Sequence, residues 1–219
     1  MDSFVLIGTR SSLVVEYEEC AARSDRRIEA AVSRHPMVRM LNRSAVVTEA
    51  DFRAADTSGC FIPCAFVPEV RRDHAEFAEK LGLEPAEPLI DPSAILASST
   101  RVGDGTFINT ASVLGALTVV GNYVVVNRSA SISHHVLLED YVSIGPGVTL
   151  ASNIRVGANT IVGTGATVMP NVRIGAGCVI AGGAVVRSNV PDDSLVSGAA
   201  STAKPLKGRR KRLFTGDEE

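Results

Sequence analysis

Three features that mark other classes of protein are missing from this sequence of 219 residues. The formal net charge is only −2, so the composition implies no bulk electrostatic attraction to nucleic acid or to an anionic membrane. No apolar stretch is long enough to span a bilayer, and the first residues, Met1 to Phe4, carry no basic region before an apolar run. We therefore expect a cytoplasmic protein that binds neither nucleic acid nor membrane.

Cysteine is also scarce, with four residues scattered among apolar neighbours. The spacing of Cys60 and Cys64 is compatible with metal ligands, but no second Cys or His pair lies nearby to complete a set of four. Cys20 and Cys178 stand alone in the sequence. We predict reduced, buried thiols and no metal site.

The sequence is rich in one pattern, a six-residue period from Ile90 to Val186. Ile, Leu or Val occupies every sixth position without a slip: Ile90, Leu96, Val102, Ile108, Leu114, Val120, Val126, Ile132, Leu138, Ile144, Leu150, Val156, Val162, Val168, Ile174, Ile180, Val186. Four residues after each of them comes a second residue, mostly small or β-branched, from Ala94 to Val190. This period fits a parallel β-helix in which short strands stack and the aliphatic side chains point inward.

The residue after each aliphatic position is often a turn former, such as Gly103, Gly145 or Asn127. Gly and Asn suit the bend between two flat faces, where a positive φ is needed. The whole stretch resembles the left-handed β-helix of the hexapeptide-repeat acyltransferases. Three repeats per coil, as in that family, would give between five and six coils.

Residues 1–88 alternate strand-like and helix-like runs, which predicts a small α/β domain with a parallel sheet. Strands are expected at Phe4 to Ile7, Ile28 to Val32, Ala45 to Val47 and Cys60 to Phe66. One helix is expected to bury Leu13, Tyr17, Cys20 and Ala21.

A second helix is expected to begin at Pro68, to face inward with Val70, Phe77 and Leu81, and to stop at Gly82. The capping-box pattern from Thr48 to Asp51 predicts a further short helix.

Two prolines in the stretch from Glu84 to Pro88 bar a continuing helix, and the domain boundary is placed there. The β-helix domain then covers residues 89–198, with a turn-rich exit at Asn189 to Asp193, and a basic tail covers residues 199–219. The tail contains Lys204, Lys207, Arg209, Arg210, Lys211 and Arg212. It is either a solvated tail or a patch that helps to hold ligand phosphates.

One hexad, Ile132 to Leu137, keeps both inward residues and places His134 and His135 between them. An imidazole accepts a proton near neutral pH, as is needed when an amine or hydroxyl attacks a thioester. Both histidines could also be simple exposed corner residues, and the spacing alone does not separate these readings.

The run from Asn127 to His135 resembles the central motif of bacterial sugar O-acyltransferases of the sialic-acid and bacillosamine type. The resemblance implies a Rossmann-like N-terminal domain, acetyl-CoA as acyl donor, a nucleotide-linked amino sugar as acceptor, and a homotrimer. His134 matches the family's general base and Asn127 the residue that approaches the sugar. His135 replaces the carboxylate that usually follows the base, and Ser143 stands where the family often has a second His near the acetyl carbonyl.

The loop after the first strand, Gly8 to Ser12, keeps one glycine of the family's nucleotide loop. Arg10 and Ser11 could meet a phosphate at the start of the helix, or the loop could be an ordinary turn. Small residues on successive coils, Ser152, Gly163, Gly182 and Gly183, match stretches that line the family's groove for the pantetheine arm of CoA.

The sequence thus predicts a CoA-dependent acetyltransferase that acts on an amino or hydroxyl group of a sugar and uses no metal. The carbonic anhydrase type of hexapeptide protein needs three zinc-binding histidines on neighbouring coils, which one adjacent pair does not supply. Two alternatives remain: a catalytically silent trimeric binding or assembly protein, and an O-acetyltransferase acting on a sugar without a nucleotide.

Overall fold

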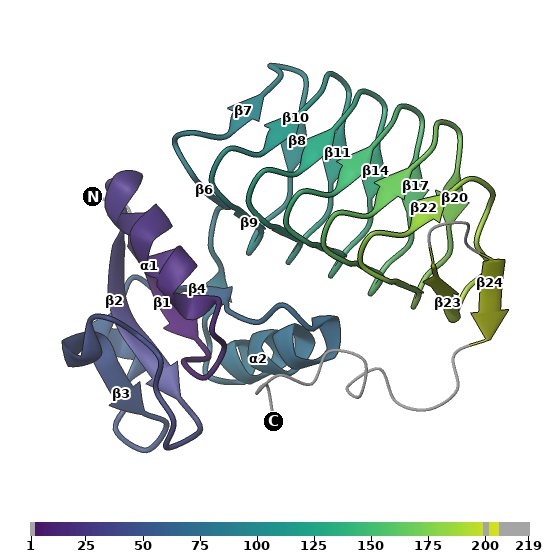
Figure 1. Cartoon of the computed structure of the whole chain (residues 1–219). Coiled ribbons are helices and arrows are strands. Elements are labelled where there is room, and N and C mark those ends of the chain that lie inside the picture. Colours follow the sequence, from purple (N-terminus) through teal and green to yellow (C-terminus); the bar gives the residue numbers. More distant parts are fainter. Residues whose placement is uncertain (1–2, 199–201, 206–219) are drawn as a thin grey trace.

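The structure, a computed structural model, describes residues 3–198 and 202–205 and consists of a small sheet domain beside a long β-helix (Figure 1). Within those ranges, neither helix combines the length and the apolar composition needed to cross a membrane. Of the basic tail, only Lys204 lies among the described residues, in a strand; the other basic positions of the tail lie outside them.

The N-terminal sheet has five parallel strands in the order β3-β2-β1-β4-β5. Their bounds are β1 (Ser3–Ile7), β2 (Arg27–Ser33), β3 (Val46–Thr48), β4 (Cys60–Pro63) and β5 (Glu84–Pro85). The chain passes from β1 to β2 on one side and later adds β4 on the other side, so the strand order reverses at β1. In open parallel sheets, ligands bind beyond the carboxyl ends of the strands at such a switch point.

The two α-helices cover opposite faces of this sheet, α1 (Val14–Arg23) on one and α2 (Pro68–Lys80) on the other. As predicted, α1 buries Tyr17, Cys20 and Ala21. In α2, Phe77 is buried as predicted, whereas Val70 and Leu81 are only half-buried. Gly82 follows the helix with φ +81°, the left-handed conformation expected of a glycine stop.

The predicted short helix from Thr48 to Asp51 is wrong. Thr48 ends β3, and its hydroxyl donates to the Asp51 carboxylate at 2.6 Å while accepting from the Asp51 N–H at 3.3 Å. These bonds close a single turn, after which the backbone is extended at Arg53 and Phe52 is buried in the core of the N-terminal domain. The connections around β3 instead contain two 3₁₀ turns, η1 (Arg43–Ala45) and η2 (Ala54–Asp56).

The β-helix consists of strands of two residues that stack into three parallel faces. Face 1 contains β6 (Leu89–Ile90), β9 (Phe107–Ile108), β12 (Val125–Val126), β15 (Ser143–Ile144), β18 (Ile161–Val162) and β21 (Val179–Ile180). Face 2 contains β7 (Ile95–Leu96), β10 (Val113–Leu114), β13 (Ser131–Ile132), β16 (Thr149–Leu150), β19 (Thr167–Val168) and β22 (Val185–Val186). Face 3 contains β8 (Arg101–Val102), β11 (Val119–Val120), β14 (Leu137–Leu138), β17 (Arg155–Val156) and β20 (Arg173–Ile174).

The aliphatic period is the core of this β-helix. Its residues from Ile108 to Val186 are buried in one cluster, and Ile90, Leu96 and Val102 pack against that cluster. The second set is also inward, and where it is polar its hydroxyls bond to the coil above: Thr106 and Thr118, for example, each donate to a backbone carbonyl 15 residues later at 2.9 Å. The predicted inward positions are therefore confirmed.

The coil continues beyond Val186, where the sequence suggests an exit. Val190 is buried and bridges to Ile174, and β23 (Ser194–Ser197) pairs in parallel with β21. The partners Ile180 and Val196 are 16 residues apart rather than the usual 18, which is why the six-residue period is lost while the coil is kept. A final strand, β24 (Thr202–Pro205), pairs antiparallel with β23.

The N-terminal domain packs against the first coils of face 1 (Figure 1). Tyr17 of α1 stacks on Phe107 of β9 with ring centroids 3.9 Å apart, and Phe61 of β4 stacks on Tyr123 at 6.1 Å. Arg23 forms an ion pair with Asp91, which lies just after β6; the Asp91 side chain is buried and the Arg23 side chain is partly exposed. The two parts thus share a hydrophobic contact, and the cavities described below lie in the N-terminal domain and along this junction.

Candidate functional site

The edges between faces of the β-helix form ridges of stacked corners, and the predicted site residues lie on two of them. The first ridge joins faces 1 and 2, and the second ridge joins faces 2 and 3. Most corners place one residue in the left-handed conformation, and non-glycine residues such as Ala111, Leu117 and Ser129 adopt it with φ between 57° and 59°.

His134 and His135 lie together on the second ridge, both exposed, just after β13. Their Nδ1 atoms are 2.9 Å apart and their rings are nearly perpendicular, at 84°. At that distance one Nδ1 carries a hydrogen and donates a hydrogen bond to the other Nδ1. If His134 is the donor, its Nε2 keeps a lone pair directed outward, which is the form a general base requires.

Ser152 lies on the same ridge directly above His134, one coil of 18 residues later. The two corners are joined by the backbone, since Asn153 N–H donates to the His134 carbonyl at 3.2 Å. Ser152 is half-exposed, so its hydroxyl can reach a ligand that lies along this ridge.

The other predicted ligand residues, Asn127, Gly163, Gly182 and Gly183, lie on the first ridge. In a single chain they are therefore separated from His134 by face 2. Gly182 and Gly183 are exposed, whereas Gly163 is buried, and a Cβ there would lie 2.7 Å from the Gly182 nitrogen. Close stacking of coils alone accounts for a glycine at position 163.

Asn127 opens onto a cavity of about 370 Å³ at the junction of the two domains. The cavity is lined by Ser12, Leu13, Glu16, Phe66, Val67, Asn127, Arg128, Pro146, Gly163 and Thr164. We call it the junction cavity. The side-chain oxygen of Asn127, Oδ1, accepts from the side-chain amide of Asn109 at 3.0 Å and from the backbone N–H of Arg128 at 2.8 Å. These bonds fix the plane of the Asn127 side chain and leave its NH₂ group to donate.

An ion pair joins the two domains across the rim of the junction cavity. Arg128 on the first ridge pairs with Glu16 of α1, and Glu16 also accepts from the Asn109 amide at 3.2 Å. This pair could not be predicted from the sequence, because the partners are 112 residues apart.

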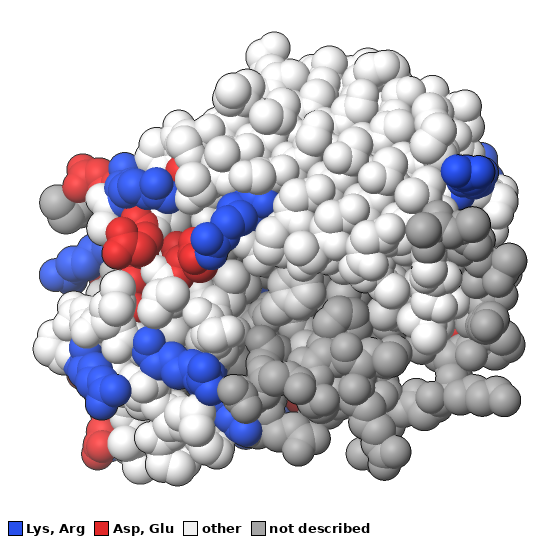
Figure 2. Space-filling view, viewed as in Figure 1, with Lys and Arg blue, Asp and Glu red and all other residues white. Residues whose placement is uncertain are grey.

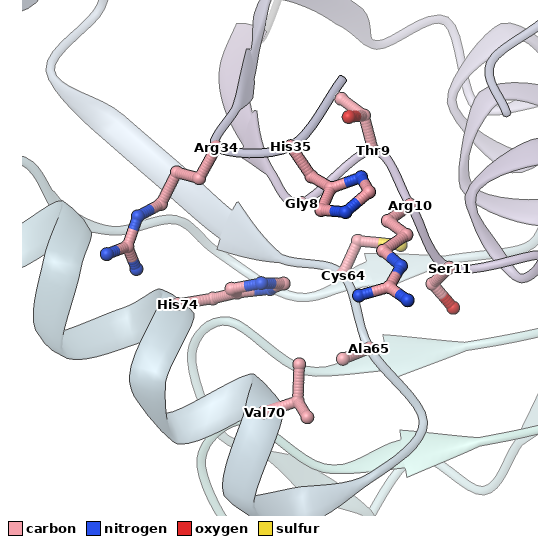
Figure 3. A pocket seen from close by; sticks show the side chains of 10 residues that line it. All are labelled: Gly8, Thr9, Arg10, Ser11, Arg34, His35, Cys64, Ala65, Val70 and His74. Carbon is pink, nitrogen blue, oxygen red and sulfur yellow. The ribbon is translucent and has the colours of Figure 1, made fainter. Parts of the chain in front are cut away.

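A second cavity lies wholly in the N-terminal domain, beyond the carboxyl ends of β1, β2 and β4 (Figure 3). It measures about 140 Å³ and is lined by Gly8, Thr9, Arg10, Ser11, Arg34, His35, Cys64, Ala65, Val70 and His74. We call it the switch-point cavity. It brings together the three predicted residues of the first loop: Gly8, Arg10 and Ser11.

In Figure 3 the side chains of Arg10, His35 and His74 surround the same space, while the guanidinium of Arg34 extends away from it. The His35 loop is tied to the first loop, because the Thr9 hydroxyl donates to Ser33 Oγ at 2.8 Å and Ser33 in turn donates to the His35 carbonyl at 2.6 Å. The guanidinium of Arg10 faces the cavity, and a cation in this position suits an anionic ligand.

Gly8 and His74 are in close contact at the floor of the switch-point cavity. Gly8 has φ +101°, and a Cβ there would lie 2.3 Å from His74 Cε1. Burial, reinforced by the charge of Arg34, lowers the pKa of His74 to about 4, so this imidazole is neutral at physiological pH. Sequence reasoning missed His74, although it lies three residues after Arg71, one residue before Ala75 and four before Ala78 along the buried face of α2.

Ser143 lies in β15, within face 1, and not on a ridge. It is completely buried on face 1, its hydroxyl donates to the Phe66 carbonyl at 2.5 Å, and it accepts from Arg71 at 2.9 Å. A hydroxyl so enclosed is not accessible to an acyl donor, and the structure gives it a role in the contact between domains.

Among residues 3–198 and 202–205, no group of three or more His, Cys, Asp or Glu side chains is placed to hold a metal ion. The four cysteines are free thiols; Cys60 is half-buried and the other three are buried. Charge is unevenly distributed on the face shown in Figure 2: acidic and basic side chains gather over the N-terminal domain and the junction, while most of the β-helix surface in view is uncharged.

Comparison with known proteins agrees with this architecture. The family described as bacterial transferase hexapeptide (six repeats) matches residues 153–188. No curated protein matches the sequence. The stacked parallel faces together with the hexapeptide match correspond to a left-handed β-helix.

Several solved structures resemble nearly the whole chain. The acetyltransferase domain of PglB from Neisseria gonorrhoeae, in complex with acetyl coenzyme A, is 28% identical with a TM-score of 0.81, over 93% of this chain and 98% of that one. A mutant of perosamine N-acetyltransferase from Caulobacter crescentus, in complex with CoA and GDP-perosamine, is 23% identical with a TM-score of 0.86, over 94% and 98%. WeeI from Acinetobacter baumannii is 19% identical with a TM-score of 0.78, over 92% and 100%. The predicted resemblance to hexapeptide-repeat sugar acyltransferases is confirmed.

Proposed function

We propose that this protein transfers an acetyl group from acetyl-CoA to an amino or hydroxyl group of a sugar linked to a nucleotide. The observation that carries the proposal is the pair of exposed imidazoles on the second ridge, with Nδ1 atoms 2.9 Å apart. The likeness to the PglB acetyltransferase domain, the most similar in sequence of the three structures above, supports the reaction type.

In this proposal His134 is the general base. Its Nδ1–H donates to His135 Nδ1, and its Nε2 removes the proton from the acceptor's amine or hydroxyl as that atom attacks the thioester carbonyl. The imidazolium so formed is stabilised by His135 and returns the proton to the departing thiolate. Bound acetyl-CoA supplies the activated acyl group, and one proton passes through His134 in each turnover.

The first ridge fits the extended arm of CoA. A Cβ on Gly165 or Gly183 would meet nothing within 4 Å, so the ridge has open space beside its backbone. The backbone amides along such a ridge can bond to the amides of a pantetheine chain. Ser152 on the second ridge could contact the same arm from the opposite side.

These contacts require two chains, because one chain carries His134 and Asn127 on different ridges. We infer a homotrimer in which the second ridge of one subunit approaches the first ridge of the next. The surface between the ridges suits such a contact, since the outward residues of face 2 are all uncharged: Ile95, Val113, Ser131, Thr149, Thr167 and Val185. Ile95 and Val113 are 65% and 42% exposed in the single chain.

For the acceptor, we propose that the sugar occupies the junction cavity beside Asn127 and that its nucleotide extends toward the switch-point cavity. The strand order and switch point support a Rossmann-like domain. Arg10 and Ser11 would bond to phosphate at the start of α1. The structure of the mutant perosamine enzyme contains GDP-perosamine, which illustrates the class of acceptor.

One observation favours a second candidate, a catalytically silent assembly protein on the same scaffold. Ser143 is enclosed between the domains, so the position that the family often fills with a second His near the acetyl carbonyl offers no group to a ligand. Acetyl transfer therefore depends on His134, His135 and whatever a neighbouring subunit provides.

The experiment incubates the full chain with acetyl-CoA and a panel of nucleotide-linked amino sugars and follows the release of free thiol. We expect at least one acceptor to release CoA well above background, and His134→Ala to abolish that release. Glu76→Ala, an exposed change on α2 outside both cavities, is the matched control. Unchanged turnover in His134→Ala would contradict the mechanism, and no turnover with any sugar would favour the silent protein.

A further inference from the structure

Arg71 of α2 is completely buried and spans the contact between the two domains. Its Nε donates to the Tyr123 carbonyl at 2.7 Å, and its Nη2 donates to the carbonyls of Tyr141 and Val142 at 2.8 and 3.2 Å. Both sets of acceptors belong to the β-helix, on two successive coils. One guanidinium on the N-terminal domain thus bonds to two coils of the other domain.

The same guanidinium also holds the loop between β4 and α2. Its Nη1 donates to the carbonyls of Ala65 and Phe66 at 2.6 and 2.9 Å. Ser143 closes the arrangement, because it accepts from Arg71 and donates to the Phe66 carbonyl. The 64–67 loop is therefore bonded to the β-helix through the Arg71 guanidinium and the Ser143 hydroxyl.

This loop separates the two cavities. Ala65 lines the switch-point cavity, and Phe66 and Val67 line the junction cavity. A shift of the loop relative to the β-helix would move one wall of each cavity at the same time. The bonds of Arg71 therefore set the distance between the proposed nucleotide site and the ridge that carries Asn127.

Only arginine can make this set of bonds. A guanidinium has five N–H donors in a rigid planar fork, whereas a lysine ammonium has three on a flexible stem. A buried cation is costly to desolvate, and an apolar residue of similar volume would often stabilise a core as well or better. The full use of the fork indicates that geometry, more than stability, is what Arg71 supplies.

We propose that Arg71 is a positioning residue that fixes the 64–67 loop and thereby aligns the nucleotide and sugar parts of the acceptor site, without touching the acyl donor. The proposal rests on the proposed function for its kinetic consequence and on the structure alone for its effect on the loop. It assigns to Arg71 a selective effect on acceptor binding.

The test compares Arg71→Lys with Arg72→Lys in the full chain. Arg72 is a matched control because it also joins the domains, through Asn159 and the ring of Tyr141, yet has no bond to the 64–67 loop. Ser143→Ala is a milder second variant that removes one bond to Arg71 and one to Phe66. It keeps the proposal testable if Arg71→Lys does not fold.

Two measurements decide the outcome. Hydrogen exchange read by mass spectrometry should show faster exchange of the 64–67 loop in Arg71→Lys, and to a smaller extent in Ser143→Ala, but not in Arg72→Lys. Steady-state kinetics should show a KM for the sugar acceptor raised about tenfold or more in Arg71→Lys, with the KM for acetyl-CoA within about twofold of the wild type.

Unchanged loop exchange in both Arg71→Lys and Ser143→Ala would overturn the proposal, as would an equal rise in both KM values. If the wild-type chain transfers no acetyl group, the proposed function fails, and the exchange measurement still decides whether Arg71 fixes the loop.

Discussion

In the proposed mechanism, the electrostatics of the base His134 depend on the residue that follows it, His135. In the resembling enzymes a carboxylate follows the base and accepts its second N–H. Here the two Nδ1 atoms are 2.9 Å apart, and in the proposed tautomer His135 Nδ1 accepts that bond. An imidazolium next to an imidazole is stabilised less than one next to a carboxylate.

His135→Ala should therefore lower kcat/KM by roughly tenfold to a hundredfold, because His134 loses the acceptor that sets its tautomer. His135→Asp should restore most of the rate, because a carboxylate accepts the same bond. The corner itself tolerates alanine, since His135 has φ 57° and Ala111, at another corner, has the same value. Thiol release at a fixed pH measures both variants, and equal rates in wild type and His135→Ala would show that the pair has no catalytic role.

His74 provides a prediction about acid stability. Its pKa is about 4 in the folded chain and about 6.5 when unfolded. Between these values the unfolded chain binds a proton that the folded chain does not, so stability is complete above pH 6.5 and falls as the pH drops toward 4. The loss from this one group is on the order of 3 kcal/mol.

Urea denaturation at pH 7 and pH 4.5 measures that loss. His74→Gln removes the titration and should show a distinctly smaller fall in unfolding free energy than the wild type. Carboxylates with lowered pKa values, such as Asp91 and Glu29, contribute equally to both proteins and cancel in the comparison. An identical fall in both proteins would contradict the assignment to His74.

At the scale of single elements, each strand of the β-helix has one inward and one outward residue, and the two contribute very differently. In β16, Leu150 is buried in the core cluster while Thr149 next to it is exposed. The strand has only these two residues, so its stability depends on packing with the coils above and below.

Leu150→Ala should destabilise the chain by about 2–5 kcal/mol, since it leaves a cavity among close-packed aliphatic residues. Thr149→Ala, on the same strand but the opposite face, should change stability by less than about 0.5 kcal/mol in the monomer. Denaturant unfolding of the two variants gives the comparison, and similar losses in both would mean that the inward ladder does not carry the stability.

The elements also show where local patterns fail. The capping-box residues Thr48 to Asp51 form only a turn, because the chain becomes extended at Arg53 while Phe52 is buried in the core of the N-terminal domain. The loss of the period after Val186 likewise does not end the coil, because a coil two residues shorter still pairs β23 with β21. Local signals are decided by the packing available to them.

At the scale of the whole molecule, the two ridges predict that each active site is shared between subunits. His134→Ala and Asn127→Ala should each be inactive alone, yet co-expressed chains should recover activity, because one subunit can supply His134 and its neighbour Asn127. With random assembly of trimers, about a quarter of the wild-type sites are intact.

Co-expression followed by thiol release checks this, together with a mass measurement that should give three times the chain mass of 23.0 kDa. Pairing His134→Ala with a chain that carries both substitutions is the control and should recover nothing. No recovery in the test mixture would place the two residues in the same subunit's site, whereas recovery in the control would show that activity does not need His134.

The sequence by itself determined the β-helix, because a six-residue period of aliphatic side chains has only one way to bury them all, coil upon coil. It also proposed His134 as the base and the loop from Gly8 to Ser11 as a ligand site; the structure places the two exposed histidines side by side and puts Gly8, Arg10 and Ser11 around one cavity. The sequence could not reveal Arg71, whose bond partners lie as many as 72 residues away, nor show that Ser143 is enclosed. Contacts between domains depend on which surfaces meet, and only the tertiary structure decides that.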